Sequence, residues 1–265
     1  EMLFVLERER RKCFFLAASA NSVTELLEDS EAEIRNRATE VLAELDRERA
    51  ANLLLEQPSD PEPLVRRTRI AVIRECRDER FVAALCEAMY DKDPRVRERA
   101  IDAMGAYGSQ EAVDALLKLL QDAKAPEDKV CATRSLGFSG HLSAYEPLHD
   151  LAKSSQDLHL RRQAIRSLVR LDPNRAREAL LPLMEDKNVR NEAAFTLVGM
   201  REERAIPGLI SMLGTVSEPK LKEVIWDGLR QVSRQNLPMD HKAWKKWYQE
   251  AHPEPEPEPE QIQDI

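Results

Sequence analysis

Three arginines that recur along one predicted helix are the residues best suited to chemistry. Arg162, Arg166 and Arg170 are spaced i, i+4, i+8, so a helix places all three on one face. The preceding predicted helix contributes Arg134 and the aromatic Phe138 to the same surface. Guanidinium groups this close repel one another and bind carboxylates well. The pattern predicts a basic, partly apolar groove for an acidic peptide or protein segment. The alternative is that Asp and Glu residues of adjacent repeats, which are described below, neutralise the arginines and leave an ordinary solvated face.

Aromatic residues near the C-terminus form a second candidate site. Trp244, Trp247 and Tyr248 are spaced i, i+3, i+4 in a short helix predicted over His241–Ala251, with Asp240 as its N-cap. In one interpretation the three rings cover the exposed end of the fold. In the other they form a docking site for a partner.

The sequence contains no pattern that indicates catalysis or a bound cofactor. Its five histidines form no H-x-x-x-H or H-E-x-x-H arrangement, and it has no G-x-S-x-G, P-loop or dinucleotide-binding fingerprint. The four cysteines form no C-x-x-C pair, which is the usual spacing of a structural zinc site. We therefore expect no catalytic residues, no metal, no cofactor and no enzymatic activity.

The stretch Asp93–Gly108 shows how helices in this chain begin and end. Asp93 is a favourable N-cap, Pro94 fits the first helical position, and Gly108 can adopt the left-handed conformation that ends a helix. The pattern recurs at intervals of about 30 residues, a period typical of solenoids. Taking Val96 as the anchor, the equivalent positions are Ile34, Val65, Val96, Asp128, Leu160, Val189 and Leu221.

Each repeat keeps the same residue types at fixed distances from its anchor. A large apolar residue follows eight positions later in every copy, and an acid precedes the anchor by three positions in six of seven. The residue directly after the anchor is always basic: Arg35, Arg66, Arg97, Lys129, Arg161, Arg190 and Lys222. The acid can pair with the basic residue four positions later, or with the next repeat. We therefore expect these basic residues to stabilise the fold rather than to bind phosphate. Three residues depart from the pattern: Asp128 at an anchor, Ala125 at a cap position and Arg69 at a position that is alanine in five other copies.

The D-P-x-V-R-x-x-A-x-x-x-L pattern of Asp93–Met104, with MGAYG at 104–108 and LGFSG at 136–140, resembles the HEAT-repeat family in its short bacterial form, that of the PBS-lyase-like repeats. The resemblance implies an all-α, right-handed α-solenoid of about seven antiparallel helix pairs. It also implies that the second helix of each pair lines a concave face, where the positions two, three, six and ten after the anchor point outward. Such faces bind partners, so we expect a non-enzymatic scaffold or adaptor. Two enzyme classes among HEAT-like proteins remain as rivals, the phycobilin lyases and the HEAT-like DNA glycosylases.

Composition restricts the partners and the domain plan. The 265 residues carry a net charge of −8, which disfavours a general nucleic-acid partner, and no apolar run reaches the length of a membrane span. Scattered cysteines favour a reducing, cytoplasmic environment. We expect a capping helix over 1–21, a solenoid over 22–233 and a capping helix over 234–252. An acidic Pro/Glu tail over 253–265 is expected to stay unfolded. The chain begins at Glu1, so it can also be part of a longer protein or complex.

Overall fold

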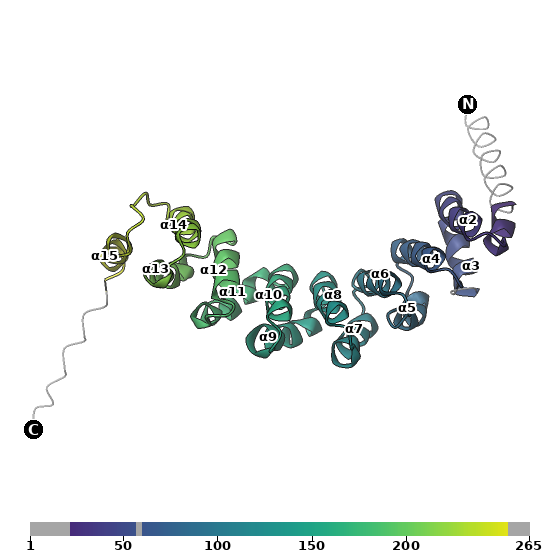
Figure 1. Cartoon of the computed structure of the whole chain (residues 1–265), viewed down its shortest axis with the longest axis horizontal. Coiled ribbons are helices and arrows are strands. Elements are labelled where there is room, and N and C mark those ends of the chain that lie inside the picture. The colour runs from purple at the N-terminus through teal and green to yellow at the C-terminus, as the bar shows by residue number, and fades with distance from the viewer. Residues whose placement is uncertain (1–21, 57–59, 254–265) are drawn as a thin grey trace, which may run out of the picture. The chain divides into compact units, whose positions relative to one another are not determined.

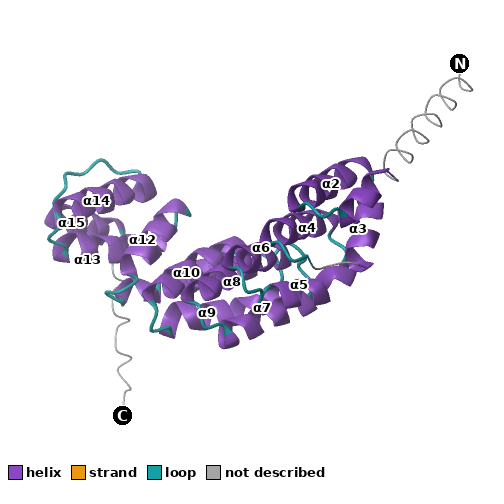
Figure 2. Cartoon of the chain, turned by 45° about the vertical axis from the view of Figure 1, so that its right-hand side comes forward, coloured by secondary structure: helices purple, strands orange, loops and turns teal. Residues whose placement is uncertain are grey.

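The helices stack in pairs along the chain in the computed structural model (Figure 1). The structure describes residues 22–56 and 60–253, and within these ranges it contains helices and loops but no strand (Figure 2). The expected capping helix at 1–21 and the Pro/Glu tail from 254 onward lie outside the described residues. The chain divides into two units between Pro173 and Asn174, inside the segment expected as one solenoid.

Unit 1 consists of two rows of helices. One row, which lies on the inner side of this unit's arc, contains the second helix of each pair (Figure 1, Figure 2). These are α2 (Ala32–Leu45), α4 (Pro63–Cys76), α6 (Pro94–Met104), α8 (Pro126–Phe138) and α10 (Leu158–Leu171). The outer row contains α3 (Arg47–Glu56), α5 (Val82–Ala88), α7 (Gln110–Asp122) and α9 (Tyr145–Ser154).

The helices of the inner row begin where the sequence predicts. The side chain of Asp93 accepts hydrogen bonds from the backbone N–H groups of Arg95 and Val96, and Pro94 is the first residue of α6. Asp157 caps α10 in the same way. The α-helical hydrogen bonding of α6 ends at Met104, earlier than expected. The chain then turns through Gly108, whose φ of +67° is the left-handed conformation that glycine adopts readily.

The apolar positions of the repeat form the core of both units. The large residue eight positions after each anchor is buried in all seven copies, which confirms this feature of the repeat. These residues are Leu42, Ile73, Met104, Leu136, Leu168, Leu197 and Leu229. Neighbouring pairs therefore bury a continuous layer of apolar side chains, and an isolated pair would leave this layer exposed to water.

Two glycines allow the middle helices of the inner row to approach closely. A Cβ atom on Gly105 would lie 2.8 Å from the backbone oxygen of Ser135, and one on Gly137 would lie 2.7 Å from Cα of Ser167. The Ser167 hydroxyl donates a hydrogen bond of 2.8 Å to the carbonyl oxygen of Thr133 across the same contact. The seam between α8 and α10 is therefore fixed by small residues.

Unit 2 contains the remaining helices and ends in the predicted short helix. Its elements are α11 (Pro173–Leu180, which starts at the division), α12 (Arg190–Gly199), α13 (Ile206–Thr215), α14 (Pro219–Ser233) and α15 (His241–Ala251). Asp240 caps α15 as expected, with hydrogen bonds from the N–H groups of Lys242 and Ala243. Across the described residues of both units, no helix has the length and hydropathy needed to cross a bilayer.

Candidate functional site

The first three recurring basic residues of unit 1, Arg35, Arg66 and Arg97, form internal ion pairs. Arg35 contacts Asp60 through two parallel hydrogen bonds of 2.9 Å, and Arg66 contacts Asp91 in the same bidentate way at 2.7 and 2.8 Å. Each of these arginines also donates to two backbone carbonyl oxygens of the loop that precedes its own helix. The guanidinium groups thus tie one repeat to the next, and they are not available to bind phosphate.

The carboxylate partners differ from the expected ones. Of the acids three positions before an anchor, Asp93 and Asp157 accept N-cap hydrogen bonds, and the partners of Arg35 and Arg66 come instead from the loop before the next inner-row helix. In the next repeat this loop position is Ala123, and Arg97 pairs with Asp128 at 2.8 Å. Asp128 is the acid that interrupts the apolar anchor column, so its departure from the pattern supplies the missing partner. Arg69, the other departure, is buried 3.4 Å from the carboxylate of Asp60.

The environment of these carboxylates keeps them ionised. Burial alone would raise the pKa of Asp91, but the hydrogen bonds from Arg66 and from the backbone N–H of Asp93 lower it below its ordinary value. The same opposing effects act on Asp60. Burial raises its pKa, but the hydrogen bonds from Arg35 and from the backbone N–H of Glu62 lower it, and the net shift is downward. The pairs are therefore charged at neutral pH.

The predicted basic surface lies on α8 and α10. Arg162, Arg166 and Arg170 are all exposed along one face of α10. Phe138, at the end of α8, is 58% exposed, and the guanidinium carbon of Arg170 lies 3.9 Å from the centre of its ring. This distance is that of a cation–π contact between neighbouring repeats. In the described parts of the chain, Arg162 makes no hydrogen bond or ion pair.

Arg134 lies on this surface, but its charge is neutralised by acidic residues of α6. Its Nη2 atom lies 2.8 Å from Oδ1 of Asp102 and 3.7 Å from Oε1 of Glu98, both on α6. The hydrogen bond to Asp102 raises the pKa of Arg134. At this one position acids of the adjacent repeat neutralise the arginine, as the alternative interpretation describes. The same acids are thereby held close to Arg134, one repeat away from α10.

The thiol next to Arg134 is not a reactive nucleophile. Cys131 lies 3.7 Å from Nη2 of Arg134, yet burial raises the pKa of its thiol to about 11. It is therefore protonated at neutral pH. In the described ranges, 22–56 and 60–253, no group of three or more His, Cys, Asp or Glu side chains is placed to hold a metal ion.

Of the three aromatic residues in α15, one is buried and two are partly exposed. Trp244 is fully buried, and its indole N–H donates a hydrogen bond of 2.9 Å to the carbonyl oxygen of Pro238. It covers α13 within unit 2 and cannot dock a partner. Trp247 and Tyr248 are partly exposed, and Tyr248 lines a cavity of about 320 Å³ between α13 and α15. Only these two residues could serve the docking interpretation.

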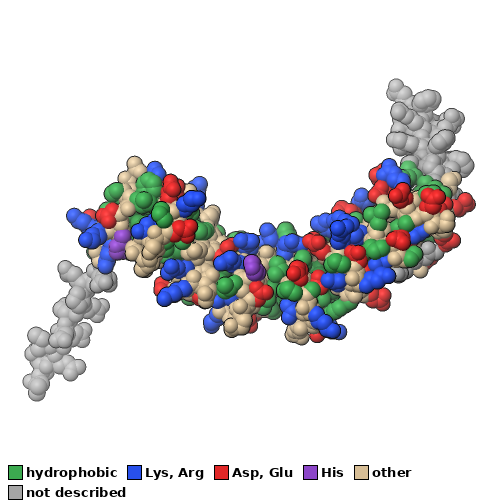
Figure 3. Space-filling model, in the orientation of Figure 1, with side chains coloured by type: hydrophobic (Ala, Val, Ile, Leu, Met, Phe, Trp, Pro, Cys, Tyr) green, Lys and Arg blue, Asp and Glu red, His purple; other side chains and the backbone are tan. Residues whose placement is uncertain are grey.

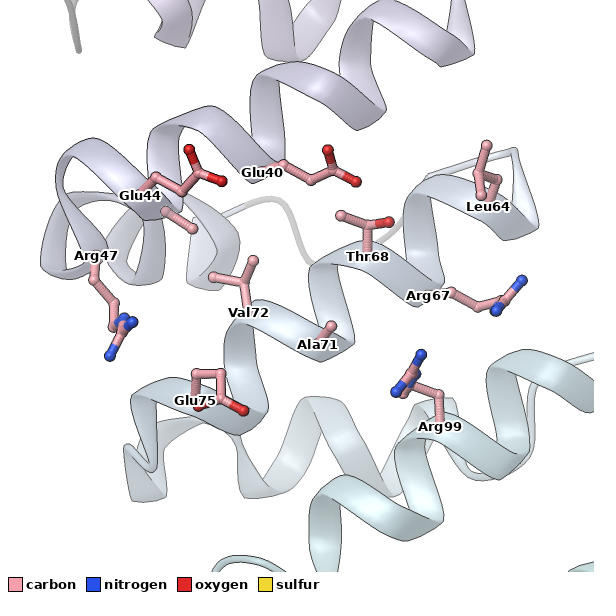
Figure 4. A pocket seen from close by; sticks show the side chains of 11 residues that line it. Glu40, Glu44, Arg47, Leu64, Arg67, Thr68, Ala71, Val72, Glu75 and Arg99 are labelled. Atoms are coloured by element: carbon pink, nitrogen blue, oxygen red, sulfur yellow. The ribbon is translucent and has the colours of Figure 1, made fainter.

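A cavity of about 400 Å³ on the inner row was not predicted (Figure 4). It lies over α4, with α2 and α6 at its sides and the start of α3 at one end, and its size is typical of ligand pockets. The outward positions of the second repeat, counted from its anchor, are Arg67, Thr68, Ala71 and Glu75, and all four line the cavity. The count from the anchor that predicts outward positions for Arg162 and Arg166 therefore also predicts that these four residues face outward.

Basic side chains gather along the edge formed by α6, α8 and α10 in the space-filling view, where acidic groups lie between them (Figure 3). The positive charge is concentrated on α10, which carries four arginines and no Asp or Glu, although the chain as a whole is acidic. A local positive surface on an acidic protein favours local binding of an acidic segment over general attraction to polyanions.

Comparison with known proteins identifies a repeat family. The family model for HEAT repeats matches residues 55–137 and 145–230. The chain is similar in structure to the complex of CpcE and CpcF of phycocyanin lyase from Nostoc sp. PCC7120, with 18% identity, 81% of this chain and 91% of that chain covered, and a TM-score of 0.48. It is also similar to human deoxyhypusine hydroxylase in complex with glycerol, with 18% identity, coverage of 91% and 92%, and a TM-score of 0.43. No curated protein matches this sequence.

Proposed function

Because this chain belongs to the HEAT-repeat family, we propose that it is a non-catalytic scaffold or adaptor that binds an acidic segment of a partner protein on α8 and α10 of unit 1. The fold is consistent with protein interaction, since helical repeats present extended rows of side chains to partners. The identity of the site depends on its side chains and not on the fold.

The observation that carries the proposal is the exposed pair of Phe138 and Arg170 beside Arg162. Aromatic and arginine side chains that are partly desolvated are the residues that contribute most to protein interfaces. An acidic segment would pair with the guanidinium groups while an apolar side chain covers the face of Phe138 that Arg170 leaves open. The acids of α6 hold Arg134, so they do not compete for the α10 arginines.

Charge reversal of the α10 arginines tests the proposal. An Arg162→Glu/Arg166→Glu/Arg170→Glu variant is compared with the unchanged chain in affinity capture from native lysate, with captured proteins identified by mass spectrometry. We expect the variant to lose specific proteins, and those proteins to contain acidic segments that bind the unchanged chain when synthesised as peptides.

The matched control reverses three exposed lysines on and beside the outer row, Lys118→Glu/Lys124→Glu/Lys153→Glu. It changes the net charge by the same amount but leaves α10 intact. If both variants lose the same proteins, net charge and not the α10 surface decides binding. If neither loses any, the proposal is wrong, and Trp247 and Tyr248 become the next surface to test.

A further inference from the structure

The cavity over α4 is a second surface, on helices that the proposed site does not use. One end holds Arg67 and Arg99, whose guanidinium groups come from adjacent helices and flank the same cavity (Figure 4). Both side chains are half-buried, and within the described residues neither has a hydrogen-bond or ion-pair partner. Two half-buried cations of the same sign repel each other, so an anion between them would lower the electrostatic free energy.

The other end of the cavity carries the opposite charge. Glu44 and Glu75 lie there together with Arg47, which leaves a net charge of −1, and no ion pair joins these three side chains in the described structure (Figure 4). Between the two ends the floor is formed by Ala71 and Val72, and Glu40 of α2 lies at one side with its carboxylate paired to Arg37. The cavity thus has a basic end, an apolar floor in the middle and an acidic end.

The spacing of these features suits an extended peptide. Arg67 and Glu75 are eight residues apart on α4, which corresponds to about 12 Å along a helix that rises 1.5 Å per residue. An extended chain covers about 13 Å in four residues, and its side chains at i, i+2 and i+4 point to the same face. An acid, an apolar residue and a base at these three positions would meet the three parts of the cavity in order.

We propose that the cavity over α4 binds an extended peptide segment of a partner in which an acidic and a basic residue are four positions apart with an apolar residue midway. The carboxylate of the segment lies between Arg67 and Arg99, and its basic group lies near Glu44 and Glu75. The apolar side chain covers Ala71 and Val72. Leu64, which is 47% exposed at the basic end, adds apolar contact beside the carboxylate. Recognition of both charges gives the site specificity that a purely basic groove lacks.

Selection from a random peptide library tests the inference without knowledge of the partner. A phage-displayed library of 12-residue peptides is selected on the immobilised full-length chain, and enriched peptides are synthesised with a fluorophore for anisotropy measurements. We expect enrichment of acid-x-apolar-x-base or its reverse, since the chain can run in either direction along the cavity. Binding is expected to fall at least tenfold in Arg67→Glu/Arg99→Glu and in Arg67→Gln/Arg99→Gln.

Two further variants make the outcome specific. Lys92→Glu/Arg95→Glu reverses two exposed charges near the start of α6 but outside the cavity, and it should bind the peptides normally. The α10 variant with Glu at 162, 166 and 170 should also bind them normally, which separates this inference from the proposed function.

The Gln variant removes the positive charge without adding a negative one and keeps a polar side chain, so its binding tests the inference if the Glu variant unfolds. Selection of peptides without the charge pattern would overturn the inference. So would patterned peptides that bind the Gln variant as tightly as the unchanged chain.

Discussion

Arg161 and Arg162 are neighbours in sequence and lie in opposite environments. Arg161 is 5% exposed and donates a hydrogen bond of 2.8 Å to the carbonyl oxygen of Ala152. Arg162 is exposed on the face of α10 that also carries Arg166 and Arg170. One residue turns a helix by about 100°, because there are 3.6 residues per turn. That rotation separates an arginine that stabilises the repeat from one that is available to a partner.

The same comparison holds for α2, α4 and α6 of the inner row. Arginines directly after an anchor, such as Arg35 and Arg66, are buried and bonded to a carboxylate of the next repeat. Arginines two or three positions after an anchor, such as Arg67 and Arg99, face the open side of the row (Figure 4). The position of an arginine relative to its anchor therefore indicates whether its charge is paired within the fold or faces the open side of the row. Overall composition and net charge carry no such information.

The largest expected effect is loss of a buried pair. Arg66→Ala leaves the carboxylate of Asp91 without its guanidinium, although the two side chains are only 9% and 13% exposed. Breaking a pair of this kind by removing one partner costs about 3 kcal/mol. We expect urea unfolding, followed by circular dichroism, to show that loss. Arg162→Ala is the matched control and should change stability by less than about 0.5 kcal/mol. Equal effects of the two substitutions would contradict the division of roles.

Acid should weaken the same pair by protonation. The pKa of Asp91 is lowered in the folded state, so its contribution to stability is present above its ordinary value near 3.9 and is lost as pH falls through the folded pKa. Asp91→Asn removes the charge permanently and should cost about 2 kcal/mol at pH 7. The difference between the two proteins should shrink below about pH 4 and disappear at lower pH. Urea midpoints measured from pH 7 to pH 2 check this, and a difference independent of pH would show that Asp91 does not titrate as described.

An added methyl group at the contact between α8 and α10 should destabilise the protein. Alanine is favoured over glycine in a helix by about 1 kcal/mol, but a Cβ on Gly137 would lie 2.7 Å from Cα of Ser167. Overpacking costs about 1–3 kcal/mol, so Gly137→Ala should be destabilising by about 1 kcal/mol net. Gly199, with open space around it, is the matched control, and its change to Ala should be neutral or stabilising. Thermal unfolding of both variants measures the contrast.

Sequence patterns predicted the fold better than the pairing within it. The repeat period, the N-cap Asp93 and the buried residues eight positions after each anchor depend on local spacing, and all are confirmed. The internal role of Arg35 and Arg66 was also predicted, but their partners Asp60 and Asp91 were not. A loop 25 residues away must fold back onto the helix to supply these carboxylates, and the helical period contains no information about that loop.

The apparent defects of the repeat illustrate the same limit. Asp128 and Arg69 break the apolar and small columns, so the pattern alone marks them as poorly packed. In the structure each lies beside an opposite charge: Asp128 pairs with Arg97 of the preceding repeat, and Arg69 lies beside Asp60 of the loop before its own helix. The candidate site shows the converse: Arg134 has the right position to bind a partner, but the pattern could not reveal that Asp102 neutralises it. Pairings between repeats depend on three-dimensional contacts that spacing does not encode.

The smallest expected effect is on the contact between Phe138 and Arg170. Cation–π contacts at exposed sites contribute about 0.5–1 kcal/mol, and Phe138 is 58% exposed. A double-mutant cycle of Phe138→Ala and Arg170→Ala, measured by urea unfolding, should give a coupling free energy in that range. A coupling of several kcal/mol would mean that the pair is a structural contact between repeats, like the buried ion pairs. A small coupling instead leaves both side chains free to rearrange around a partner, because little stability is lost when the ring and the guanidinium separate. Loss of binding in either single variant can then be attributed to the interface and not to unfolding of unit 1.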